Sequence, residues 1–124
     1  MTYNLLVLIS YYLLILISIL GYGSFSLRLF DKRLSNNNFG YVGLFGIYVL
    51  LIYSYLSNFI LAHSEIHNIL LIILGIILFI IDIIKNYSEC KKEIFFTFIV
   101  FFLIFSSLLI FKNHDDFPYY HFPY

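Results

Sequence analysis

Long apolar runs constrain this chain more than any other feature of its sequence. Four segments are almost free of charge and long enough to cross a hydrocarbon core, which needs about 20 residues and at least about 17. They cover 4–27, 41–62, 68–84 and 94–111. The sequence therefore predicts an all-α membrane protein, with four transmembrane helices in 1–111.

The composition excludes a soluble fold for these 124 residues. Hydrophobic residues make up 62% of the chain and charged residues 11%, against about 45–50% and about 25% in soluble domains. A small domain buries only part of its surface, so lipid must act as the solvent. Seven bases balance seven acids, which gives no electrostatic case for nucleic acid as a partner.

Lys and Arg in the loops predict the orientation, because cytoplasmic loops carry an excess of these residues. Loop one (28–39), read as a solvated turn between antiparallel helices, and loop three (85–93) hold three bases each, whereas loop two (63–67) holds none. The N-terminus is then outside the cytoplasm. The tail, 112–124, begins an extracytoplasmic loop. Nothing before the first run resembles the basic start of a signal peptide, so that run is predicted to be retained.

The second predicted helix carries two periodic patterns. Three glycines recur at every third residue: Gly40, Gly43 and Gly46. They predict the close approach of another helix. Three tyrosines lie seven residues apart: Tyr41, Tyr48 and Tyr55. They share one face, which predicts hydroxyls with partners inside the bundle. Near the end of this helix, the polar residues Tyr53, Ser54, Ser57 and Asn58 favour hydrogen bonds between helices over a water-filled pocket.

Polar groups elsewhere in the apolar segments are few. Asp82 lies three residues before Lys85, which predicts a neutralising pair at the cytoplasmic end of its helix. A proton relay is the alternative, and it would need a second intramembrane acid that the four segments lack. In the fourth segment, spacings of three and four predict a stripe that packs or contacts lipid. The stripe consists of Phe95, Phe98, Phe102, Phe105 and Leu109.

Loop two contains His63-Ser64-Glu65-Ile66-His67. Two imidazoles four residues apart share a face on a helical turn and could bind a metal. Glu65 is one position away from its place in the H-E-x-x-H zinc motif. Solvated side chains are therefore the favoured interpretation.

The last eleven residues gather two adjacent carboxylates, two histidines and both prolines. Asp115 and Asp116 follow an apolar run, and the proline-containing segment after them cannot continue a helix. The carboxylates are thus predicted at the membrane surface, where they could hold a divalent cation or supply a general base. His114 and His121 could add a ligand or transfer a proton. An aromatic belt at headgroup level is the alternative.

The pattern Asp115-Asp116-x-x-x-Tyr120-His121-x-Pro123 resembles the acidic motif in the first extracytoplasmic loop of C-type (GT-C) glycosyltransferases, which use polyprenyl-phosphate-linked sugars. It is similar also to large uncharacterised bacterial membrane proteins placed beside that superfamily. The resemblance implies Asp115 or Asp116 as catalytic base or metal ligand, with Tyr120, His121 and His114 at the substrate. It covers about nine residues, and three spans precede the motif here, whereas the superfamily usually begins with the helix before it.

Two functions are consistent with these features. The resemblance implies the N-terminal part of a multi-pass glycosyltransferase of the bacterial inner (cytoplasmic) membrane, which moves a sugar from a polyprenyl-phosphate donor to an envelope glycan or lipid. The helices and lipid-phosphate pocket of such an enzyme are then expected in a further part of the chain. The alternative is a non-catalytic integral membrane protein, a subunit or scaffold, whose glycine and tyrosine faces are its working surfaces.

Overall fold

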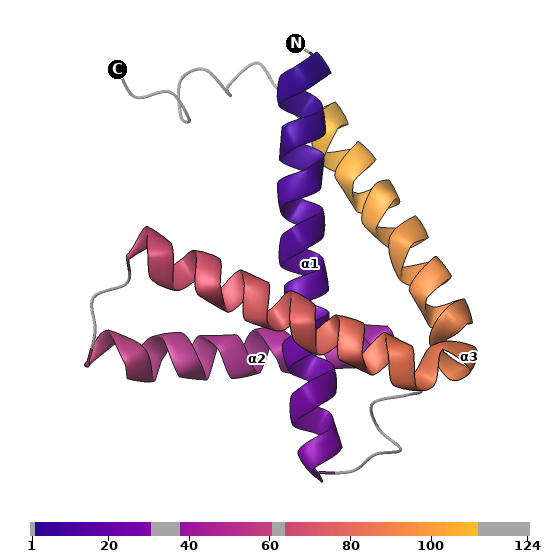
Figure 1. Cartoon of the computed structure of the whole chain (residues 1–124). Helices are drawn as coiled ribbons and strands as arrows, with labels where there is room; N and C mark the ends of the chain where they lie inside the picture. Colours follow the sequence, from indigo (N-terminus) through magenta and orange to yellow (C-terminus); the bar gives the residue numbers. More distant parts are fainter. Residues whose placement is uncertain (1, 31–37, 61–63, 112–124) are drawn as a thin grey trace, which may run out of the picture.

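Helices are the only regular secondary structure in the described part of the chain. A computed structural model describes residues 2–30, 38–60 and 64–111, which form α1 (Thr2–Phe30), α2 (Phe39–Asn58) and α3 (Glu65–Phe111) (Figure 1). Asn38 caps α2, since its side-chain oxygen accepts hydrogen bonds from the backbone N–H groups of Gly40 (2.9 Å) and Tyr41 (3.2 Å). These helices coincide with the predicted apolar segments, so the all-α prediction is confirmed.

Helix α3 contains two of the predicted helices, joined by a kink. Its 47 residues are helical except at Asn86, where φ is −133° and ψ is 24°. The predicted loop three, 85–93, is therefore wrong, because the helix continues on both sides of that residue. The segment lacks Gly and Pro and contains helix-forming Lys and Glu. Asn86 Nδ2 donates to the Asp82 carbonyl oxygen at 3.0 Å, a local bond of the kind that bends helices.

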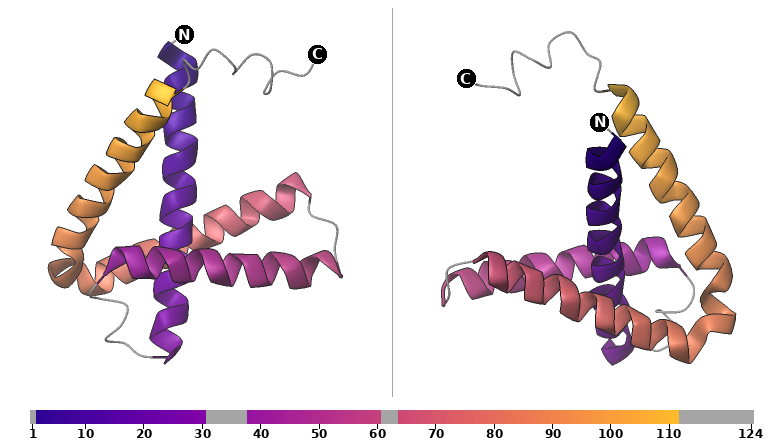
Figure 2. Two further views of the ribbon diagram at one scale, coloured as in Figure 1. Left: turned by 180° about the vertical axis from the view of Figure 1, so that it is seen from behind. Right: turned by 45° about the horizontal axis from the view of Figure 1, so that its top comes forward.

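Helix α1 passes between α2 and the first arm of α3, and both run crosswise to it (Figures 1 and 2). The prediction of antiparallel neighbours on either side of loop one is thus wrong. Glycines explain the difference. A Cβ added at Gly23 would overlap the Val42 carbonyl oxygen, and one added at Gly21 would overlap the Gly75 carbonyl oxygen. Such close approach is confined to the points where the helices cross.

The predicted glycine face of α2 is only partly used. A Cβ at Gly46 would overlap the Ile19 carbonyl oxygen of α1, so this contact is confirmed. A Cβ at Gly43 would lie 3.7 Å from Leu20 Cδ2, an ordinary contact, and Gly40 faces only its own cap residue. The glycines of α1, Gly21 and Gly23, are at the two crossings and were not singled out by the sequence pattern.

The core is small, and most large apolar side chains are exposed. Five buried residues form one cluster: Leu20, Leu27, Phe39, Val42 and Phe79. Three segments are long and apolar enough to cross a membrane: Leu6–Phe30, Phe39–Asn58 and Glu65–Tyr87. The chain is therefore a multi-span membrane protein whose exposed apolar faces meet lipid. The second arm of α3 is helical as predicted, while its role as a fourth span stays a prediction.

The second arm of α3 folds back so that its end lies beside the start of α1 (Figure 2). The Tyr12 and Phe105 rings are 6.2 Å apart, centroid to centroid, and Phe105 is buried. Phe95 and Phe102, from the same predicted stripe, are exposed. Phe98 is half-buried, and the side chain of Leu109 lies outside the described residues. The described stripe therefore contains both packing and outward-facing residues, as the pattern allowed.

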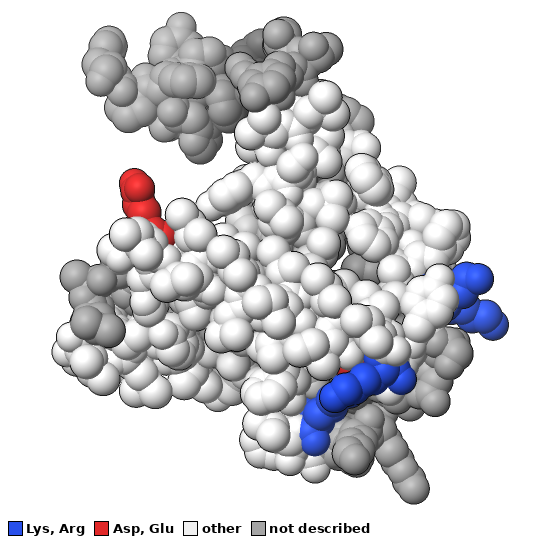
Figure 3. Space-filling view, in the orientation of Figure 1, with Lys and Arg blue, Asp and Glu red and all other residues white. Residues whose placement is uncertain are grey.

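Basic side chains gather near the end of α1 and the kink of α3 (Figure 3). The described bases are Arg28, Lys85, Lys91 and Lys92. The sequence placed these residues on a common side of the membrane, and the structure brings them to one end of the molecule. That this side is cytoplasmic stays a prediction.

Candidate functional site

A buried ion pair lies where α1 meets the kinked part of α3. Arg28 Nη2 contacts Asp82 Oδ1, and the two side chains are 26% and 6% exposed. An ionisable residue within a membrane-spanning segment is costly, and it is therefore the first place to look for function. Asp82 is the acid that the sequence analysis singled out, but its partner comes from another helix.

The predicted pair of Asp82 with Lys85 is not what the structure shows. Lys85 is exposed, so its ammonium group lies on the surface with the other bases at that end of the molecule. The guanidinium of Arg28 comes from the crossing helix, is planar and is more weakly hydrated than an ammonium group, which suits it to a buried pair. Among the residues with described side chains, Asp82 thus has Arg28 as its ionic partner.

Hydrogen bonds connect this pair to the kink. Asn86 Nδ2 donates to Asp82 Oδ1 at 3.2 Å as well as to the Asp82 carbonyl oxygen. The carboxylate therefore holds both the crossing helix and the residue at which α3 bends. Arg28 Nε is buried and has no hydrogen-bond acceptor within the described segments. A cavity of about 290 Å³ beside the pair is lined by Ser24, Arg28, Asp82 and Lys85, among others.

This arrangement is suited to holding helices together. One acid and one base neutralise each other, and the buried Ser24 donates to the Gly21 carbonyl oxygen at 3.1 Å. The alternative of a proton relay needs a second acid nearby, and neither Glu65 nor Glu93, the other acids with described side chains, lines this cavity. Within 2–30, 38–60 and 64–111, no three His, Cys, Asp or Glu residues are placed to hold a metal ion.

A second polar contact joins the end of α2 to the start of α3. The Tyr53 and His67 rings stack with centroids 5.9 Å apart and an angle of 7°. The Tyr53 hydroxyl lies 3.5 Å from His67 Nε2. The predicted hydrogen bonding between helices is confirmed for Tyr53, whereas Ser57 Oγ donates within α2, to the Ser54 carbonyl oxygen. His63, the other histidine of the possible metal pair, lies outside the described residues.

The predicted tyrosine face of α2 is wrong about burial. Tyr41, Tyr48 and Tyr55 are exposed, and within the described segments their rings pair with the aromatic rings of Phe45 on α2 and of Phe59, the C-cap residue. The part-buried tyrosine is Tyr22, whose hydroxyl donates to the Leu71 carbonyl oxygen at 2.9 Å. The small residues around it, Ser18, Gly21, Gly23 and Ser24, could have indicated this packed face, but they were not singled out from the sequence.

The residues predicted for catalysis and binding in the tail lie outside the described part of the chain: Asp115, Asp116, His114, Tyr120 and His121. Their roles, and a divalent cation held by the two carboxylates, stay predictions.

No protein-family model, curated protein or solved structure matches this chain. The resemblance to C-type glycosyltransferases therefore rests on the tail motif alone. The fold and its polar contacts rest on the described helices, and they are the basis for the proposals that follow.

Proposed function

We propose that this chain is a membrane-integral subunit or scaffold that binds another membrane helix through the exposed face of α2. The proposal rests on one observation, the exposure of the Tyr48 side chain in the middle of an apolar helix. Tyr48 lies at the middle of α2 (Phe39–Asn58), its side chain is 59% exposed, and its neighbour on the same face is the ring of Phe45.

The position of Tyr48 would leave its hydroxyl without a hydrogen-bond partner in the lipid if the chain were isolated. When α2 crosses the bilayer, Tyr48 lies about 14 Å from either end of the helix, too far for a tyrosine to reach the headgroups. Its hydroxyl has no hydrogen-bond partner within the described segments. A polar group in hydrocarbon needs a partner. Another membrane helix with an acceptor opposite Tyr48 would supply it.

Tyr48→Phe is expected to weaken this association, because it removes the hydroxyl and keeps the ring. A hydrogen bond between membrane helices contributes about 1–2 kcal/mol in model peptides, or about five- to thirtyfold in affinity. A photoreactive residue at Leu51, which is exposed on the same face, should give a discrete protein adduct in the source membranes. Tyr48→Phe should lower its yield by that factor.

Tyr55→Phe is the matched control, since Tyr55 lies one turn from the end of the same helix and its hydroxyl can reach the interface. Its adduct should form in normal yield. Adducts with lipid only, or equal yields from both variants, would contradict the scaffold. An adduct of the chain with itself would make the scaffold a homo-oligomer.

The tail supports a second candidate, the N-terminal part of a glycosyltransferase that uses a polyprenyl-phosphate sugar donor. Asp115 and Asp116 come four and five residues after Phe111, the last residue of α3, in the sequence, and the acidic loop likewise follows a helix in that superfamily. Asp115→Ala and Asp116→Ala in the full-length protein are expected to abolish transfer of the lipid-linked sugar, because a base or metal ligand is lost. Unchanged transfer in both variants would remove this candidate.

A further inference from the structure

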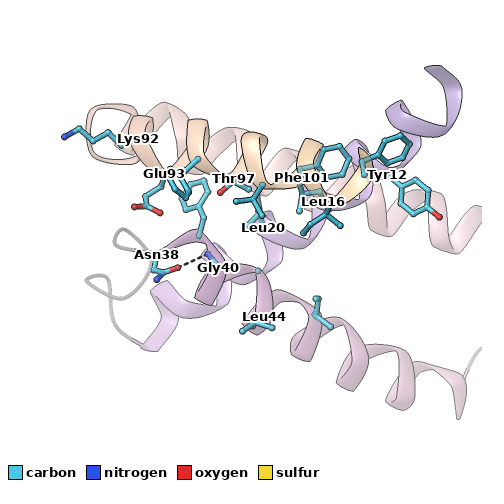
Figure 4. Close-up of a pocket in the computed structure, with 17 residues that line it drawn as sticks. Tyr12, Leu16, Leu20, Asn38, Gly40, Leu44, Lys92, Glu93, Thr97 and Phe101 are labelled. Carbon is cyan, nitrogen blue, oxygen red and sulfur yellow. Dashed lines mark hydrogen bonds between the residues drawn. The ribbon is translucent and has the colours of Figure 1, made fainter. Parts of the chain in front are cut away.

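A cavity of about 810 Å³ opens between the middle of α1, the start of α2 and the second arm of α3. Its walls are mostly apolar, with Leu16 and Leu20 from α1, Leu44 from α2 and Phe101 from α3 (Figure 4). The ion pair of Arg28 and Asp82 does not line it. The cavity is thus separate from the cluster at the kink and from the outer face of α2 at Tyr48.

Polar groups gather at one end of this cavity. The Glu93 carboxylate points across the gap toward Asn38 and Gly40, while the Lys92 side chain points away from the cavity (Figure 4). Asn38 Oδ1 accepts the two bonds that cap α2, and its Nδ2 has no acceptor within the described segments. Glu93 has no ion pair there either. The mouth therefore offers a carboxylate and an amide donor, while the Lys92 ammonium group lies outside it (Figure 4).

The length and volume of the cavity fit a lipid acyl chain better than a helix. Along α3 its lining runs from Glu93 to Phe105, twelve residue steps or about 18 Å, and an acyl chain that fills one leaflet of a core about 30 Å thick is about 15 Å long. A helix of that length would fill roughly 1,400–2,000 Å³, given a diameter of about 10–12 Å, about twice the space present. A lipid acyl chain from one leaflet has the right length and is thinner than a helix.

The polar mouth selects the headgroup. An unpaired carboxylate favours a cation, and the Asn38 amide can donate a hydrogen bond to a phosphate beside it. We propose that the cavity binds one zwitterionic glycerophospholipid, with an acyl chain along Leu16, Leu20 and Phe101 and a primary ammonium headgroup at Glu93. Basic pockets between membrane helices bind anionic headgroups, and Glu93 is the group that turns this mouth toward an amine.

The test uses the whole chain in nanodiscs that contain equal amounts of phosphatidylethanolamine and phosphatidylglycerol with identical acyl chains, followed by native mass spectrometry. One phosphatidylethanolamine should remain bound, favoured about fivefold over phosphatidylglycerol. Glu93→Gln should remove that preference, because an amide carries no charge, while a lipid remains bound. Equal retention of the two lipids by the unmodified chain would overturn the headgroup assignment.

Gly43→Leu should expel either lipid, because Gly43 lines the cavity and a Cβ there meets only Leu20 Cδ2 at 3.7 Å. Gly43→Ala adds one methyl group to the same site and should keep the lipid. Thr97→Leu fills the cavity from α3 and should act like Gly43→Leu, so a folding defect in one variant does not decide the result. A lipid retained by both leucine variants, or a dimer that only they lose, would overturn the proposal.

Discussion

Replacing Asp82 by alanine is expected to destabilise the membrane-embedded fold by about 3 kcal/mol, the lower end of the range for breaking a buried ion pair. The loss of the carboxylate leaves Arg28 partly buried without a counter-charge and takes an acceptor from Asn86 at the kink. The lower end applies because Arg28 keeps 26% of its side-chain surface exposed, which allows partial relief by movement toward the interface. The free energy of unfolding, measured by steric trapping in bilayers, gives this value directly.

Two control variants separate the ion pair from other effects of the substitution. Lys85→Met should change the free energy of unfolding by less than about 0.5 kcal/mol, since exposed charges contribute little. A double variant, Arg28→Met with Asp82→Leu, should regain most of the loss, because apolar side chains of similar size can replace a buried pair. If Lys85→Met costs as much as Asp82→Ala, Lys85 is the partner of Asp82 after all.

The partner of Asp82 shows where sequence reasoning works and where it stops. The apolar runs predict the helices because a chain in lipid must satisfy its backbone hydrogen bonds within each segment. Asp82, the acid at the end of the third run, was recognisable because an ionisable residue in an apolar segment is costly. Its partner was sought along the same helix, at Lys85, because local spacing is all that a single sequence offers. Arg28 is 54 residues away in the sequence and reaches Asp82 only through the crossing of α1 and α3.

The predictions of a loop at 85–93 and of a buried tyrosine face on α2 failed for related reasons. The segment 85–93 is charged, which is typical of a loop between spans, but Lys and Glu are also good helix formers. Asn86 alone departs from helical geometry. Tyrosines seven residues apart share a face, but the spacing does not say which face is buried. In α2 the face toward α1 contains Val42 and Gly46, which places Tyr48 on the opposite, exposed side.

Gly21→Ala is expected to disrupt the crossing of α1 and α3, although the substitution adds only one methyl group. That Cβ would overlap the Gly75 carbonyl oxygen and crowd the Phe79 backbone nitrogen, at 2.9 Å. Both are backbone atoms of a helix, so neither can move as the end of a flexible side chain would. Overpacking typically costs about 1–3 kcal/mol, and separating the helices also strains the bond from Tyr22 to Leu71 and the ion pair of Arg28 and Asp82. A loss of about 3 kcal/mol is expected.

Gly43→Ala is the matched control, because it makes the same change within a helix where the Cβ meets only Leu20 Cδ2 at 3.7 Å. Alanine is a better helix former than glycine by about 0.8–1.0 kcal/mol, so this variant should be slightly more stable than the unmodified chain. The two substitutions are therefore expected to change the free energy of unfolding in opposite directions. Equal stability of the two variants, with unchanged distances between spin labels on α1 and α3, would contradict the close crossing at Gly21. If the crossing is lost in Gly21→Ala but kept in Gly43→Ala, the fold depends on backbone contact at Gly21, because both variants carry the same new side chain.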